Sequence, residues 1–111
     1  MRSAYNELLK GIETRLRAGI PLRDAVGGMA AEGEGRLQAL AGDVQLKLEG
    51  GGTLSEALRS LETRVPAGHA ALIDAGESSG RLDETLAGII AEEKLLAEAR
   101  RRLLQRLAYP L

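Results

Sequence analysis

The chain has 111 residues and contains no cysteine, phenylalanine or tryptophan, and its richness in Leu, Ala, Glu and Arg predicts a single all-α domain with an aliphatic core. A formal net charge of −1 argues against a general nucleic-acid-binding protein, and the lack of cysteine excludes disulfides and thiolate metal sites. No secretion signal is visible, and no apolar run reaches the roughly 18 residues that a membrane-spanning helix needs.

Three helices are expected in the first half of the chain. The first covers residues 3–18, and Gly19 follows it as a left-handed stop. The second covers residues 21–33 with Pro21 in its first turn, and Gly27 and Gly28 inside it indicate a kink or a close helix crossing. The third covers residues 35–48. Apolar residues recur at three- and four-residue steps in the first and third helices, at Tyr5, Leu8, Leu9, Ile12 and Leu16, and at Leu37, Leu40, Val44 and Leu48.

Three further helices are expected after the glycines at 50–52. Thr53 and Glu56 have the spacing of a capping box at the start of a short fourth helix, residues 54–61. A fifth helix is expected from Val65-Pro66 to about Ala75. The last runs from about residue 82 to 108 and is long enough for its C-terminal half to project. Its stripe has a seven-residue repeat: Leu82, Leu86, Ile89, Glu93, Leu96, Arg100, Leu103 and Leu107.

The stretch "DAGESSGRL" at residues 74–82 is expected to turn a corner between the last two helices. Gly76 is placed to end one helix, and Ser79 or Gly80 to cap the next. Glu77 is expected to be exposed or bound to backbone N–H groups. A phosphate loop would need a Walker-type Lys-Ser/Thr, and the G-x-S-x-G pattern of a nucleophile elbow is also missing.

No catalytic, cofactor or metal site is predicted. His69 is the only histidine and has no evident base or orienting partner nearby in the sequence, so it is interpreted as a surface or boundary residue. Asp74 and Glu77, three residues apart, could share a divalent cation. Acid pairs at helix ends are more often solvated, and the question stays open.

Four arginines and no acid lie between residue 100 and the end of the chain: Arg100, Arg101, Arg102 and Arg106. A solvated helix face is the simplest interpretation. A nucleic-acid patch is disfavoured because stacking aromatics are missing. Because the cluster precedes "LAYPL", the arginines also fit the cytoplasmic approach to a membrane helix.

Several motifs resemble those of the type II secretion system F family, the inner-membrane platform proteins of type II secretion and type IV pilus machines. They are "LRAGIPLRDAV" (16–26), "EGGGTLSEAL" (49–58), Pro66, "AGESSGRLDETL" (75–86) and a final Tyr-Pro. The residues that carry the resemblance are Gly19, Pro21, Gly51, Leu54, Leu58, Pro66, Gly76, Glu77, Gly80, Leu82, Leu86, Tyr109 and Pro110.

The resemblance implies a compact bundle of about six helices. Residues 1–111 would form one cytoplasmic domain at the bacterial inner membrane, truncated before a transmembrane helix that follows Tyr109-Pro110. It also implies a scaffold and not an enzyme, without cofactors or nucleic acid. The implied partners are a hexameric assembly ATPase, pilin or pseudopilin, other inner-membrane components and further copies of the chain. Val65, where family members often have an aromatic residue, and the Gly27-Gly28 pair depart from the family pattern and leave open which machine is served.

Two questions remain open from the sequence. Glu77 either accepts backbone hydrogen bonds at its corner, which is favoured because helix ends need such acceptors, or faces a partner subunit together with the arginine cluster. The alternative to a platform protein is a soluble helical adaptor without a membrane anchor, which would dimerise through the apolar stripe of its last helix.

Overall fold

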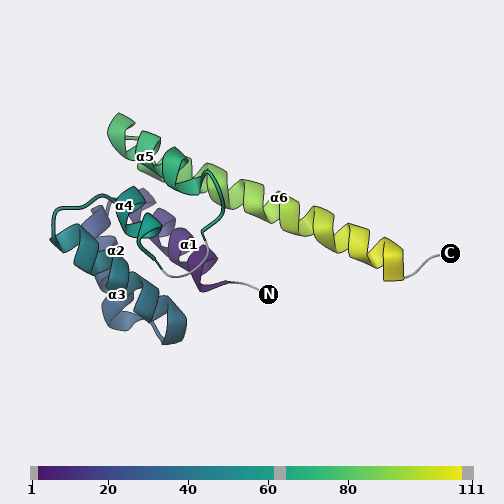
Figure 1. Ribbon diagram of the computed structural model, residues 1–111, viewed down its shortest axis with the longest axis horizontal. Helices are drawn as coiled ribbons and strands as arrows, with labels where there is room; N and C mark the ends of the chain where they lie inside the picture. The colour runs from purple at the N-terminus through teal and green to yellow at the C-terminus, as the bar shows by residue number, and fades with distance from the viewer. Residues whose placement is uncertain (1–2, 62–64, 109–111) are drawn as a thin grey trace.

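The part of the chain that the structure describes folds into six helices, as expected (Figure 1). The computed structural model describes residues 3–61 and 65–108, and these contain no strand. The helices are α1 (Ala4–Arg17), α2 (Leu22–Glu32), α3 (Gly35–Glu49), α4 (Leu54–Arg59), α5 (His69–Ser79) and α6 (Leu82–Ala108). The prediction of an all-α fold with a long last helix is therefore confirmed.

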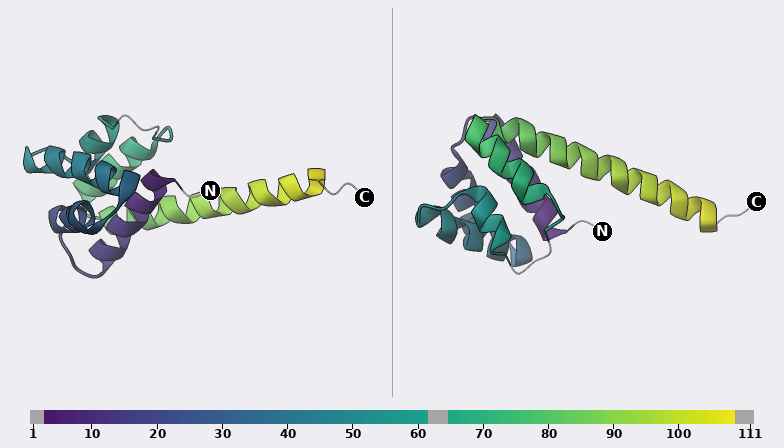
Figure 2. Two further views of the ribbon diagram at one scale, coloured as in Figure 1. Left: turned by 90° about the horizontal axis from the view of Figure 1, so that it is seen from below. Right: turned by 45° about the horizontal axis from the view of Figure 1, so that its top comes forward.

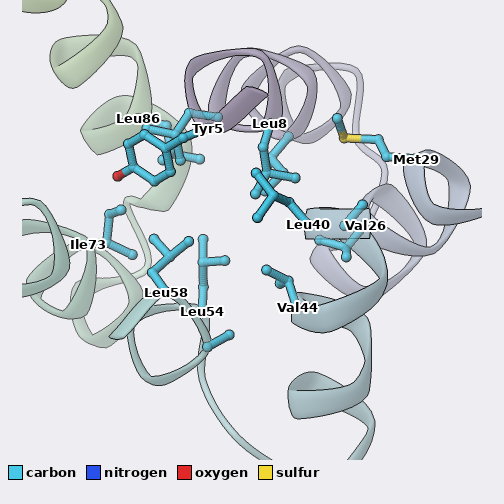
Figure 3. Packing of buried hydrophobic residues seen from close by; sticks show 14 of the residues in the cluster. Tyr5, Leu8, Val26, Met29, Leu40, Val44, Leu54, Leu58, Ile73 and Leu86 are labelled. Carbon is cyan, nitrogen blue, oxygen red and sulfur yellow. The ribbon is translucent and has the colours of Figure 1, made fainter. Parts of the chain in front are cut away.

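A single aliphatic core lies between the helices, and all six contribute to it (Figure 3). Leu8 of α1, Leu58 of α4 and Leu86 of α6 are fully buried and meet side chains from α2, α3 and α5. The periodic residues predicted for α1 and α3 lie in or against this core, which explains why these two helices were recognisable from spacing alone. The remaining fully or nearly fully buried apolar residues include Leu9, Ile12, Val26, Val44, Leu54 and Ile73.

The C-terminal half of α6 extends well beyond the bundle (Figures 1 and 2). The molecule measures 56 × 31 × 26 Å, and its radius of gyration is 15.3 Å. A compact chain of this length would have a radius of about 13 Å, so the projecting arm dominates the shape. Within residues 3–61 and 65–108, no helix combines the length and the apolar character required to cross a bilayer.

Capping residues set the ends of α1 and α2, and each end lies one residue inside the predicted boundary. The Ser3 hydroxyl caps α1 by accepting from the N–H of Asn6 at 3.1 Å, and Gly19 follows with a left-handed φ of 90°. Pro21 occupies the N-cap of α2 and not its first turn. Gly27 lies at a close approach of α2 to α3, because a Cβ there would be 3.2 Å from Nε2 of Gln45. The contact is with the end of a flexible side chain, so a side chain at position 27 would require only a small movement of Gln45.

The boundaries predicted for α5 are wrong at both ends. The helix begins at His69 and not at Val65-Pro66, because Gly68 has a left-handed φ of 87° that separates the Pro66 turn from the helix. It ends at Ser79 and not near Ala75, because the left-handed residue that terminates it is Gly80, with a φ of 74°. The chain does turn between α5 and α6, as predicted, but residues 74–79 form the last part of α5 and not the turn.

Candidate functional site

Glu77 connects two helices that are distant in the sequence. Its carboxylate accepts the backbone N–H of Leu54 at 2.7 Å and that of Ser55 at 3.0 Å. These groups are among the first N–H groups of α4, which have no partner within the helix. The interpretation of Glu77 as a backbone acceptor therefore matches the geometry, although its donors belong to α4 and not to its own corner.

The capping box of α4 satisfies the groups that Glu77 leaves free. The Thr53 hydroxyl accepts the N–H of Glu56 at 3.2 Å, and the Glu56 carboxylate accepts the N–H of Thr53 at 2.8 Å. This hydrogen bond from the Thr53 backbone lowers the pKa of Glu56 below its ordinary value. Together with Glu77, the box satisfies every free N–H of the first turn and places negative charge at the positive end of the helix dipole.

Gly76 brings α5 and α6 into contact just before the corner. A Cβ at this position would be 2.4 Å from the hydroxyl oxygen and 2.9 Å from Cβ of Thr85. The prediction that Gly76 ends the helix is wrong, because this buried glycine lies inside α5 and is required for close packing. Gly80 is the C-cap, and the N–H of Arg81 closes the turn by bonding to the Gly76 carbonyl at 2.8 Å.

The other motif residues surround this junction or shape the turns. Leu54, Leu58 and Leu86 lie in the core beneath it, and Leu82 packs against the core edge. Gly51 has a left-handed φ of 92° after α3, and Pro66 is exposed in the turn before α5. Tyr109 and Pro110 lie outside the described residues. The four arginines of the C-terminal cluster are exposed on the projecting part of α6.

His69 is a correction to the sequence analysis, because it is not a surface or boundary residue. Only 9% of it is exposed, and its Nδ1 forms a hydrogen bond of 2.8 Å with the Tyr5 hydroxyl while the two rings stack with centroids 5.8 Å apart. Burial, with a smaller effect of the Glu93 charge, raises the pKa of Tyr5. The partner lies 64 residues away, so no local signal could have revealed it.

The geometry does not favour cation binding by Asp74 and Glu77. Both oxygens of Glu77 face N–H donors, whose positive ends disfavour a cation at the same atoms. Asp74 is exposed. Among the residues that the structure describes, no three His, Asp or Glu side chains gather in a way that could hold a metal.

A second feature lies where α1 meets the middle of α6. A groove of about 560 Å³ there has apolar residues Leu9, Ile89 and Ile90 and charged residues Lys10, Glu93, Lys94 and Arg100 among its lining. Beyond the groove, the leucines of α6 are exposed, with values of 49% for Leu96 and 69% for Leu107. The structure therefore has two notable features: the junction of α4 and α5, which is held by the hydrogen bonds of Glu77, and the projecting half of α6, whose leucines are exposed.

Comparison with protein-family models identifies the family of this chain. The model of the family "Type II secretion system (T2SS), protein F" matches residues 14–111. The chain belongs to the type II secretion system protein F family. The match contains every motif residue named above, including Glu77, the α6 arm and its arginines.

Membership in the protein F family indicates the kind of assembly to which this domain belongs. The family consists of structural platform proteins of an inner-membrane secretion machine. The chain is thus a domain of such a platform. Its conspicuous polar residues fit this assignment, since Glu77 and the capping box hold helices together and His69 is paired with a buried tyrosine.

Proposed function

We propose that this protein F domain acts as a cytoplasmic scaffold of a type II secretion or type IV pilus machine. In this role it binds the hexameric assembly ATPase and transmits its cycle to the extraction of pilin or pseudopilin from the inner membrane. Copies of the chain associate with one another in the platform. A transmembrane helix following Tyr109-Pro110 anchors the domain to the membrane.

The family match over residues 14–111 is the observation that carries this proposal. The shape of the domain supports it, because a bundle with a projecting helix can hold a partner at one end and connect to the membrane at the other. Arg100, Arg101, Arg102 and Arg106 collect at the far end of this arm. Anionic headgroups attract such basic segments by about 1 kcal/mol for each arginine near the surface.

Binding of the cognate assembly ATPase to the full-length protein in lipid nanodiscs tests the central claim. We expect the ATPase to co-sediment with protein-loaded discs and not with empty discs. A hexameric ATPase from an unrelated machine serves as the specificity control. No binding by the cognate ATPase above that control would contradict the coupling role.

The alternative function is a soluble adaptor that dimerises through α6, and the exposed leucines of the arm favour it. Fractionation of the native gene product with a carbonate wash separates the two. Retention in the washed membrane pellet supports the anchored platform. Release into the supernatant supports the adaptor.

A further inference from the structure

The groove where α1 meets α6 continues onto the projecting half of α6 as a row of three residues, defined here as the arm row: Ile90, Ala97 and Leu104. Residues seven positions apart lie on the same face of a helix. Ile90 packs against the edge of the core, Ala97 is exposed, and Leu104 is 59% exposed. Leu86 and Ile89, which are buried in the core, do not belong to the row, so a partner that covers the row does not have to displace them.

The shape of this surface fits a second helix. Beyond α1, no other helix in the described parts of the chain lies beside the projecting half of α6 (Figures 1 and 2). An amphipathic helix binds such a surface by placing its apolar residues along the row. The row extends from Ile90 to Leu104, a length of about 21 Å at 1.5 Å per residue, which corresponds to about four turns of a partner helix. The small side chain of Ala97 at its centre lets the two helices approach closely.

The charges around the groove specify the chemistry of that helix. Lys10 of α1 and Lys94 and Arg100 of α6 line the groove and are exposed. Within the described residues, none of the three has a carboxylate within 4 Å. Glu93 is the one acid among the described lining residues, and it is half-buried. A partner that approaches the groove therefore meets an excess of unpaired positive charge.

Two other occupants fit this surface less well. The projecting arm of a second copy is itself basic, because residues 95–108 contain four arginines and one glutamate, so it would be repelled by the cations of the groove. Single-stranded nucleic acid would match the positive charge, but its bases bind mainly by stacking on aromatic side chains. The arm row is aliphatic throughout. An acidic amphipathic helix satisfies both the apolar row and the positive rim.

We propose that the α1–α6 groove and the arm row bind an acidic amphipathic helix of another protein. The apolar face of that helix packs on Ile90, Ala97 and Leu104, and its carboxylates pair with Lys10 and Arg100 on the two sides of the row. This inference goes beyond the proposed function, because it identifies a binding surface and the chemistry of its partner without assigning the helix to a component of the machine.

Fluorescence anisotropy with a pair of synthetic peptides tests the charge preference of the 111-residue chain. The probe is a labelled helical peptide of about five turns, with leucine at alternating third and fourth positions and glutamate at the positions that flank them. The control peptide has lysine in place of every glutamate. We expect the acidic peptide to bind at least about tenfold more tightly than the control. Its affinity should fall as the salt concentration rises, because the ion pairs are exposed to solvent.

Two matched pairs of variants test whether this surface is the binding site. Arg100→Glu should weaken binding of the acidic peptide about tenfold, because an attraction becomes a repulsion. Arg102→Glu makes the same change about 200° around the helix and should leave the affinity within about twofold. Leu104→Gln should weaken binding about tenfold through the loss of apolar contact. Leu95→Gln, an exposed leucine about half a turn away from Leu104, is its control.

Each other outcome overturns the inference. Equal affinity for the two peptides, or no binding of the acidic peptide at about 1 mM protein, means that the groove does not select an acidic helix. Equal losses in Arg100→Glu and Arg102→Glu mean that only the overall charge of α6 attracts the peptide. A wild-type dimer in sedimentation equilibrium that Leu104→Gln alone dissociates means that a second copy covers the row. Circular dichroism melting checks that each variant is folded. ATPase binding by the full-length protein is measured separately, so this inference and the proposed function can fail independently.

Discussion

Replacing Glu77 by glutamine tests whether the junction of α4 and α5 holds the bundle together. The wild-type carboxylate accepts two N–H groups, at 2.7 and 3.0 Å. Glutamine has one acceptor oxygen, so its amide NH₂ group would point at the second N–H donor. Hydrogen bonds to charged groups are worth about 1.5–3 kcal/mol, and the lost charge at the start of α4 adds about 0.5 kcal/mol. We therefore expect Glu77→Gln to lower the free energy of unfolding by about 2–3 kcal/mol.

Thermal and urea unfolding followed by circular dichroism measure this loss. In a domain of this size it corresponds to a decrease in Tm of about 10 °C. Asp74→Asn is the matched control, because it removes the same charge from the same helix at an exposed position whose carboxylate has no hydrogen bond among the described residues. Its expected effect is within about 0.5 kcal/mol. Hydrogen exchange should show faster exchange at the amides of Leu54 and Ser55 in Glu77→Gln alone.

A Glu77→Gln variant that unfolds like Asp74→Asn would refute the structural account. If the same variant also abolished secretion or piliation in the full-length protein, Glu77 would act through contact with a partner subunit. A large loss of stability together with retained ATPase binding at low temperature would instead limit its role to the fold.

Three further changes probe the packing and the caps. Gly76→Ala should destabilise the protein relative to Gly88→Ala by about 1–3 kcal/mol in urea unfolding, because both gain helix propensity but only the first Cβ collides with Thr85; equal stabilities would disprove the close contact. Tyr5→Phe should cost about 1 kcal/mol at neutral pH through the lost bond to the buried histidine. Because the pKa of Tyr5 is raised in the folded state, wild-type stability should fall as the pH rises above about 10, where the unfolded chain releases this proton first, and Tyr5→Phe should show a smaller fall in pH-dependent melts. Thr53→Ala should lower stability by about 1 kcal/mol, since the N–H that it caps at the start of α4 becomes unpaired; an unchanged melting curve would show that water replaces the hydroxyl without penalty.

Most of the helices could be predicted from short-range sequence patterns. The core faces of α1 and α3, the stop at Gly19 and the capping box of α4 all depend on residues within about one or two helical turns of each other. Backbone geometry and hydrophobic periodicity act over this range, so composition and spacing are sufficient to predict them. Errors occurred at the ends of α5, where several glycines compete to be the left-handed residue. Only packing shows that Gly76 is needed inside the helix while Gly68 and Gly80 bound it.

The hydrogen bonds of Glu77 and His69 join residues 22 to 64 positions apart, and sequence patterns do not reach that far. Glu77 could be expected to accept backbone hydrogen bonds, but its donors in α4 depend on how α5 crosses that helix. The pairing of Tyr5 with His69 likewise depends on the approach of α1 to α5. The seven-residue repeat of α6 could be recognised in the sequence. Its spacing, however, is the same whether the stripe is buried or exposed, so the repeat does not predict burial. Only the tertiary structure shows where the bundle ends and the leucines of the projecting half of α6 are left exposed, because burial depends on which helices occupy the surrounding space.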